Sequence, residues 1–247
     1  MPLSLAILIG LLAAALVSMA AYALLGSRPD PDAQRKGTRF LMGVGDFLAH
    51  WFLWTLTPME RLFLRLGATP DLFNFVGLGF GMLSGLLIGT GRLELGGLAI
   101  ALGGVADILD GRLARALKLE SDYGKFIDST LDRFVEVFAF LGFVVYLRHH
   151  TLGPLVAAAA ITGSLLVSYA RARGESVGVL CKEGLMQRAE RLVLCCLACL
   201  LDAPLVAHFN WAPGSVMLWV LLLIAAGTFL TAAQRTLWIA LRLRGRG

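Results

Sequence analysis

The chain has 247 residues, of which 57% are hydrophobic, and its mean hydropathy is +0.75. A water-soluble domain cannot bury that much apolar surface, so the composition predicts an integral membrane protein. Its apolar stretches, taken below in chain order, predict an all-α polytopic fold. The formal charge of +5, from 22 basic and 17 acidic residues, concerns orientation and anionic lipid in such a protein and does not indicate a nucleic-acid partner.

The first predicted element is a helix over residues 3–25, which contains no charge and is long enough to span a bilayer. No basic stretch precedes it, as a secretory signal would require, so we expect a retained anchor helix. A polar linker follows, and residues 1–45 form the first predicted segment. We expect the linker to be cytoplasmic because it carries four basic residues.

Residues 46–66 combine Trp51 and Trp54 with Arg61 and Arg65, and Pro58 is expected to break them into two parts. This mixture predicts an interfacial amphipathic segment on the cytoplasmic leaflet. A conventional transmembrane helix is the alternative. The remainder, 67–247, is the predicted six-helix catalytic membrane domain.

Six apolar stretches predict the core helices, at about 69–89, 93–117, 124–146, 153–171, 189–203 and 215–241. In the first of them, Gly77, Gly81 and Gly85 recur every four residues, which predicts a face for close helix packing. In this layout only Arg92 and Arg148 lie on the outer side, and the other 20 basic residues lie on the inner side. The positive-inside rule therefore turns the inner ends toward the cytoplasm, and we expect a bacterial inner-membrane protein.

Residues 107–132 hold the main functional signal, because four of their aspartates form two helical pairs. Asp107 and Asp110 lie within roughly 60° of each other around a helix, and Asp128 and Asp132 within about 40°. The pairs stand at facing ends of two apolar segments, so the folded hairpin brings four carboxylates together near a membrane surface.

Gathered carboxylates repel one another, and hard divalent cations such as Mg²⁺ or Mn²⁺ would neutralise them while also holding substrate phosphates. Gly111 and Gly124 remove side chains where a nucleotide or diphosphate would approach, and Arg115 is a fixed cation for phosphate. A charge cluster solvated by headgroup water is one alternative. An ion or proton transporter is another, although no charged residue continues the path across the membrane.

The pattern of Asp107, Asp110, Gly111, Ala114, Arg115, Gly124, Asp128 and Asp132 resembles, without a gap, the signature of the CDP-alcohol phosphotransferase family. The similarity extends over roughly residues 66–241. It implies transfer of a phosphatidyl group from CDP-diacylglycerol to an alcohol, with release of CMP, by a homodimeric enzyme.

The resemblance also implies a role for each residue of the pattern. Two divalent cations, Mg²⁺ or Mn²⁺, would be held by Asp107, Asp110 and Asp128, and Asp132 would share one of them and act as the general base. The nucleotide and diphosphate would be bound by Gly111, Ala114, Arg115 and Gly124. For Glu136, one turn after Asp132, a pairing with Arg133 is favoured over a role in orienting Asp132.

A cluster of basic residues in the second half predicts an anion pocket for the acceptor; its members are Arg171, Arg173, Lys182, Arg188 and Arg191. Ordinary cytoplasmic flanking charge is the alternative. The segment from Ser168 to Glu175 resembles the phosphatidylinositol-phosphate synthase branch of the family, with a departure at Gly174. A later segment resembles that branch at Arg188, Glu190 and Arg191 and departs from it at Gln187 and Ala189. The opening Thr69-Pro70-Asp71 is similar to that branch as well, which adds Thr69 and Asp71 to the nucleotide site.

The branch resemblance implies inositol phosphate as the acceptor. Glycerol 3-phosphate or an unphosphorylated alcohol remains open as the alternative.

Overall fold

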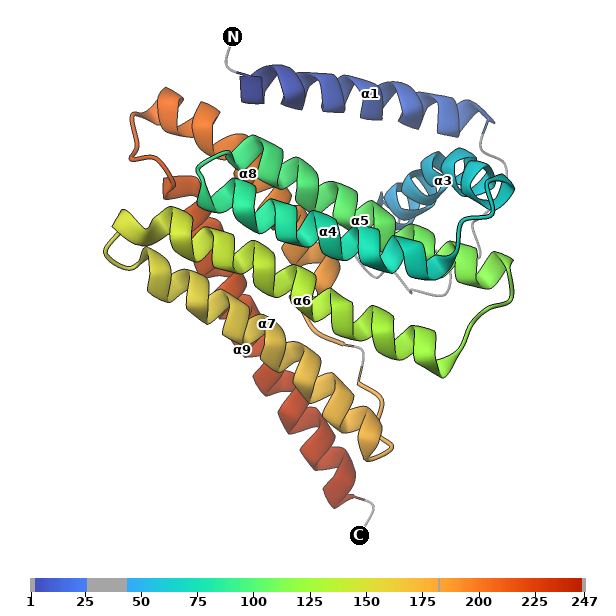
Figure 1. Ribbon diagram of the computed structural model, residues 1–247. Helices are drawn as coiled ribbons and strands as arrows, with labels where there is room; N and C mark the ends of the chain where they lie inside the picture. The colour runs from blue at the N-terminus through green and yellow to red at the C-terminus, as the bar shows by residue number, and fades with distance from the viewer. Residues whose placement is uncertain (1–2, 26–43, 182, 246–247) are drawn as a thin grey trace. The chain divides into compact units, whose positions relative to one another are not determined.

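The computed structural model describes residues 3–25, 44–181 and 183–245, and the elements in these ranges are all helical (Figure 1). The N-terminal helices are α1 (Leu3–Leu25) and α3 (Val44–Arg65). Six further helices follow, α4 (Pro70–Gly89), α5 (Leu93–Ala116), α6 (Asp122–Tyr146), α7 (Gly153–Ser176), α8 (Arg188–Phe209) and α9 (Ser215–Arg244). A short 3₁₀ helix, Leu147–His149, connects α6 to α7. The all-α prediction and the six core helices are confirmed.

Four of these helices, α4, α7, α8 and α9, are long and apolar enough to cross a membrane. Helices α5 and α6 carry the aspartates of the signature and further charged residues within their apolar sequences. Helix α1 covers the residues expected of the anchor, and an apolar helical stretch runs from Leu12 to Leu25 within it. Its anchor role and the interfacial role of α3 remain predictions.

Helix α3 is continuous through Pro58, so the prediction that this residue breaks the segment is wrong. A proline inside a helix removes one N–H donor, and neighbouring hydroxyl groups can support the turn around it. Thr55 Oγ1 donates to the carbonyl of Phe52 at 2.6 Å, and Thr57 Oγ1 donates to that of Leu53 at 3.3 Å. Both bonds reinforce the turn that precedes the proline.

The chain forms two compact units. The first comprises Met1–Phe73 with Ile108–Glu120, and the second comprises Asn74–Asp107 with Ser121–Gly247. One boundary passes through α5, which is a continuous helix, so that Asp107 and Asp110 stay one turn apart along it. The division into segments 1–45, 46–66 and 67–247 stays a prediction.

Aromatic contacts join the helices of the first unit. The ring of Tyr22 on α1 lies 5.4 Å from that of Phe47 and 5.6 Å from that of Trp54, both on α3. The indole N–H of Trp51 donates to Ser18 Oγ at 3.0 Å. These contacts attach α1 to α3 through one face of each helix.

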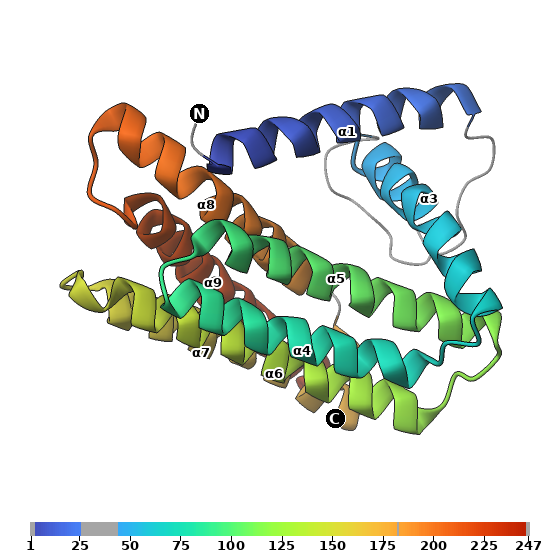
Figure 2. The ribbon, with the colours of Figure 1, turned by 45° about the horizontal axis from the view of Figure 1, so that its top comes forward.

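In the second unit α7 lies along α9, and α6 lies along α7 (Figures 1 and 2). Glycines permit the close approach of α4 to α6, since a Cβ atom on Gly85 would collide with the backbone of Phe138 and one on Gly142 with Gly85. Gly81 meets Val135 in the same way. Small residues matter here because, in lipid, packing replaces the hydrophobic drive between helices. The predicted glycine face of α4 is confirmed at Gly81 and Gly85, whereas a Cβ atom on Gly77 would have only ordinary contacts at 3.8 Å.

Candidate active site

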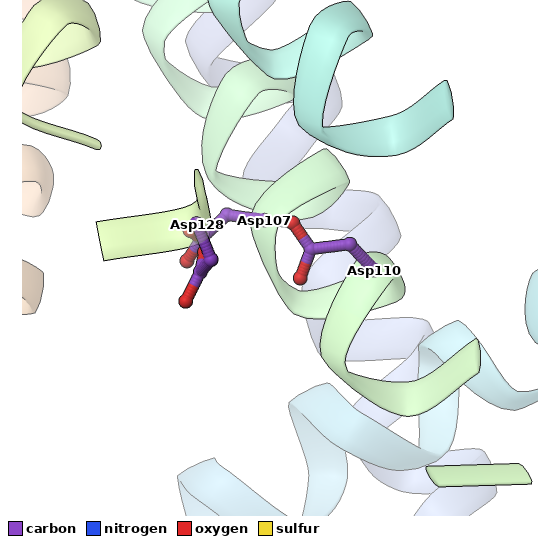
Figure 3. Close-up of side chains that lie close together, drawn as sticks. All are labelled: Asp107, Asp110 and Asp128. Atoms are coloured by element: carbon purple, nitrogen blue, oxygen red, sulfur yellow. The ribbon is translucent and has the colours of Figure 1, made fainter. Parts of the chain in front are cut away.

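Three of the signature aspartates lie together. Asp107 and Asp110 project from α5 and Asp128 projects from α6 (Figure 3). One carboxylate oxygen of each lies within 4.8 Å of the other two. Asp110 is 6% exposed, whereas Asp107 and Asp128 are partly buried. The geometry that the helical spacing predicts is therefore present for these three side chains.

The helices that carry the aspartates have defined ends at the turn between α5 and α6. Helix α5 ends through Lys118, whose φ of +56° is left-handed, while the amide of Leu119 donates back to the carbonyl of Ala114 at 2.9 Å. Helix α6 begins at the N-cap Ser121, whose Oγ accepts the amide of Gly124 at 3.1 Å. These contacts define where α5 ends and where α6 begins.

Asp132 is linked to this cluster through Arg188, the first residue of α8. Arg188 Nη1 donates to Asp107 Oδ1 at 2.8 Å, and Nη2 lies 2.6 Å from Asp132 Oδ1. The side chains of Asp132 and Arg188 are 15% and 19% exposed, so these ion pairs are largely shielded from solvent. The sequence reasoning placed Arg188 in an acceptor pocket and did not foresee its contact with two of the aspartates.

A second pair, Arg191 with Glu136, lies deeper in the same unit. Arg191 Nε donates to Glu136 Oε1 at 2.6 Å, and both side chains are 2% exposed or less. Arg191 Nη1 also donates to the carbonyl of Met186 at 3.1 Å. Arg133 Nη1 is 3.9 Å from Glu136 Oε2, so the favoured pairing with Arg133 is present but is longer than the pairing with Arg191.

The other basic residues of the predicted acceptor pocket stand at the end of α7. Arg171 and Arg173 are exposed; Arg171 Nε pairs with Glu175 Oε1 at 2.9 Å, and Arg173 Nη1 lies 3.5 Å from Ser176 Oγ. Lys182 lies outside the described residues. Of this set, Arg188 is the member placed beside the aspartates, and Arg191 is the buried one.

The predicted nucleotide residues fall into two groups. A Cβ atom on Gly124 would meet only Ser121 Oγ, at 3.4 Å, and one on Gly111 would meet the flexible guanidinium of Arg115, at 3.2 Å for Nη1. At both glycines the neighbouring atoms belong to side chains, whereas at Gly85 they belong to the backbone of Phe138. Ala114 is partly buried on α5.

Thr69 and Asp71 lie at the start of α4, where they also have a structural use. Thr69 Oγ1 accepts the amide of Leu72 at 3.4 Å, and Asp71 is in the first turn, where a negative charge is favourable. Helix capping alone accounts for a threonine and an aspartate at these positions.

A family model described as CDP-alcohol phosphatidyltransferase matches residues 68–230. The chain belongs to the CDP-alcohol phosphatidyltransferase family. It is 34% identical over 200 residues to a phosphatidylinositol phosphate synthase of Streptomyces avermitilis, covering 76% of this chain and 79% of that protein.

Two solved structures of the Mycobacterium tuberculosis phosphatidylinositol phosphate synthase are also similar to it. The structure with CDP-DAG bound has a TM-score of 0.65 and 26% identity, and the match covers 74% of this chain and 92% of that one. The complex with manganese and citrate has a TM-score of 0.66 at the same identity, covering 74% and 88%. The resemblance in the signature and the fold are both confirmed, and this family member is an integral membrane transferase.

The aspartate cluster fits the divalent cations that the family uses. Carboxylate oxygens are the ligands that Mg²⁺ and Mn²⁺ prefer, and oxygens on opposite sides of Mg²⁺ are about 4.2 Å apart. The three oxygens within 4.8 Å of one another need to move little to share one ion.

Proposed function

We propose that this phosphatidyltransferase moves the phosphatidyl group of CDP-diacylglycerol to inositol phosphate and releases CMP. The observation that carries the proposal is the cluster of Asp107, Asp110 and Asp128, to which Arg188 links Asp132. The names of the similar synthases support the acceptor, and the mycobacterial structure with CDP-DAG bound supports the donor.

Asp107, Asp110 and Asp128 would hold two divalent cations, with Asp132 sharing one of them. Bound cations supply positive charge that offsets the donor diphosphate and the charge that develops on the departing CMP. The protein contributes the positions of the carboxylates, which depend on the helical spacing along α5 and α6.

Asp132 is the proposed general base. Its carboxylate would accept the proton of the acceptor hydroxyl as that oxygen attacks the phosphorus. The ion pair of 2.6 Å with Arg188 orients this carboxylate, so Arg188 serves the base directly as well as offering charge to an anionic acceptor.

The donor headgroup would lie beside Gly111 and Gly124, where the glycines carry no side chain, and Arg115 would pair with its phosphates. Ala114, Thr69 and Asp71 complete the proposed nucleotide site. The acyl chains of the donor would extend sideways into the lipid, which explains why the enzyme is a membrane protein.

The acceptor site would be formed by basic residues, since a phosphorylated polyol brings a dianion that arginine binds with paired hydrogen bonds. The proposed set is Arg171, Arg173, Lys182, Arg188 and Arg191. Within this set Arg191 would act indirectly and not by contact with the acceptor, because its guanidinium is buried against Glu136.

We further propose that the protein is a homodimer in the bacterial inner membrane with this site facing the cytoplasm. The orientation is supported by the distribution of basic residues. In the predicted layout 20 of them lie on the side of this site, and two, Arg92 and Arg148, lie on the opposite side.

The proposal is tested by following CMP release from CDP-diacylglycerol by the purified protein in detergent. Release should require Mg²⁺ or Mn²⁺, stop with a chelator, and be faster with inositol phosphate than with inositol, serine or glycerol 3-phosphate. Metal-independent release, or a preference for an unphosphorylated alcohol, would contradict it.

A further inference from the structure

Arg112 lies within the signature, between Gly111 and Ala114, and its side chain is only 8% exposed. Its Nε donates to Glu60 Oε2 at 2.6 Å, and Nη2 lies 3.4 Å from Thr57 Oγ1. Both acceptors are on α3, and all these residues belong to the first compact unit. Helix α3, which precedes residues 68–230 of the family match, thus contacts the helix that carries the signature.

The contact is made on the side of α5 opposite to Asp110 and Ala114. Asp110 and Ala114 each lie two residues from Arg112, so each is about 160° away from it around the helix. An ion pair at Arg112 therefore fixes the rotation of this part of α5 about its own axis. That rotation decides where Asp110, Gly111 and Arg115 point.

The burial of the pair favours positioning over stability as its role. Glu60 is 17% exposed, so both partners lose most of their hydration. A buried ion pair often contributes little net stability compared with an apolar pair of the same size, and in some proteins such pairs are retained because they select one arrangement of the elements that they join. Asp122 and Lys125 also form an ion pair, at 3.0 Å, but their side chains are 99% and 73% exposed. This pair keeps its hydration and does not fix the orientation of a helix.

We propose that Glu60 is a positioning residue for the donor. It holds Arg112, and through Arg112 it orients the segment of α5 from Asp110 to Arg115 toward the diphosphate and nucleotide. Helix α3 is then part of the active-site scaffold as well as a membrane-surface element. This inference rests on the proposed function, because it assigns the donor to that segment.

The test is Glu60→Gln, which keeps the shape of the side chain and removes its charge. We expect the donor KM and the equilibrium Kd for CDP-diacylglycerol, measured without acceptor, both to rise at least about fivefold, as expected for loss of one charged hydrogen bond. The acceptor KM should stay within about twofold, because the acceptor residues that the structure describes lie on α7 and α8. Glu60→Asp should restore part of the donor affinity.

Asp122→Asn is the matched control, since it removes an exposed ion pair and should leave both KM values unchanged. A folded Glu60→Gln protein with the donor affinity of the wild type would overturn the inference. So would an equal loss of donor and acceptor affinity together with a lower melting temperature, which is the mark of a purely structural pair.

If Glu60→Gln does not fold, the exchanged pair of Glu60→Arg with Arg112→Glu decides the matter. A folded exchanged protein with a donor KM near that of the wild type supports positioning by the ion pair, while a raised KM or failure to fold contradicts it. Wild-type protein that releases no CMP from the donor contradicts the proposed function instead, which keeps the two failures distinct.

Discussion

At the scale of single residues, arginine side chains compensate the acidic side chains of the site within a largely apolar chain. Arg188 lies between Asp107 and Asp132. Its terminal nitrogens Nη1 and Nη2 each pair with one of these carboxylates, which offsets part of the repulsion between them. Glu136 and Arg191 form a second ion pair, which is almost completely buried. In the proposed function, Arg188 with its two aspartates takes part in the reaction, whereas Glu136 with Arg191 joins α6 to α8.

Asn substitutions should separate the roles of the aspartates. Asp132→Asn should reduce turnover by at least about a hundredfold while Mn²⁺ still binds, because a general base contributes 10²–10⁴-fold. Asp110→Asn should instead weaken Mn²⁺ binding. CMP release and the electron paramagnetic resonance of Mn²⁺ measure the two effects. Substantial turnover by a folded Asp132→Asn protein would exclude the general-base role.

Arg191→Ala should destabilise the protein strongly, because it leaves the buried Glu136 without its nearest partner, a change that costs about 3–5 kcal/mol. Arg171→Ala breaks a pair that is 48% and 41% exposed and should cost about 1 kcal/mol or less. Thermal unfolding in detergent compares them. Equal melting temperatures of the two variants would show that burial of the Arg191 pair does not matter.

At the scale of elements, glycines have two separate uses in this chain. Gly85 and Gly142 lie where α4 and α6 meet backbone to backbone, whereas a Cβ atom on Gly111 or Gly124 would meet only a side chain of the same chain segment, that of Arg115 or of Ser121. The same residue type therefore serves helix packing in the membrane and ligand access at its surface.

Gly85→Ala should lower the melting temperature, because the added Cβ atom collides with the backbone of Phe138, which cannot move aside cheaply. Gly124→Ala should fold normally, and Gly124→Leu should weaken the binding of CDP-diacylglycerol with Mn²⁺ affinity retained. Thermal unfolding and donor binding distinguish these cases. Normal donor binding by Gly124→Leu would place the nucleotide elsewhere.

The elements could be predicted from the sequence because their signals are local. Apolar runs end at charged or glycine-containing turns, and the spacing of Asp107 with Asp110 predicts a shared face. The pairs of Arg188 with Asp107, Glu136 with Arg191 and Glu60 with Arg112 join residues 81, 55 and 52 positions apart, and no local pattern indicates such partners. The continuous course of α3 through Pro58 depends likewise on contacts that its own sequence does not reveal.

At the scale of the whole molecule, the asymmetry of basic residues predicts one orientation in the bilayer. The turn between α5 and α6 should face the cytoplasm, and the 3₁₀ helix after α6 should face the opposite side. Donor and acceptor would then reach the aspartates from the compartment that holds soluble nucleotides and sugar phosphates.

Single added cysteines test this orientation. Arg148→Cys should react with a membrane-impermeant maleimide in intact spheroplasts, and Glu120→Cys should react only after the membrane is opened. Wild-type protein is the control, since its own cysteines are buried or partly buried. Labelling of Glu120→Cys in intact cells would invert the proposed topology.

A competition assay tests the central claim most directly. Purified protein, Mn²⁺ and CDP-diacylglycerol are mixed with equal amounts of inositol phosphate and glycerol 3-phosphate, and the lipid products are identified by mass spectrometry. The proposed function predicts phosphatidylinositol phosphate as the main product, in amounts equal to the CMP released. Phosphatidylglycerol phosphate as the main product, or no lipid product with active metal and donor present, would contradict it.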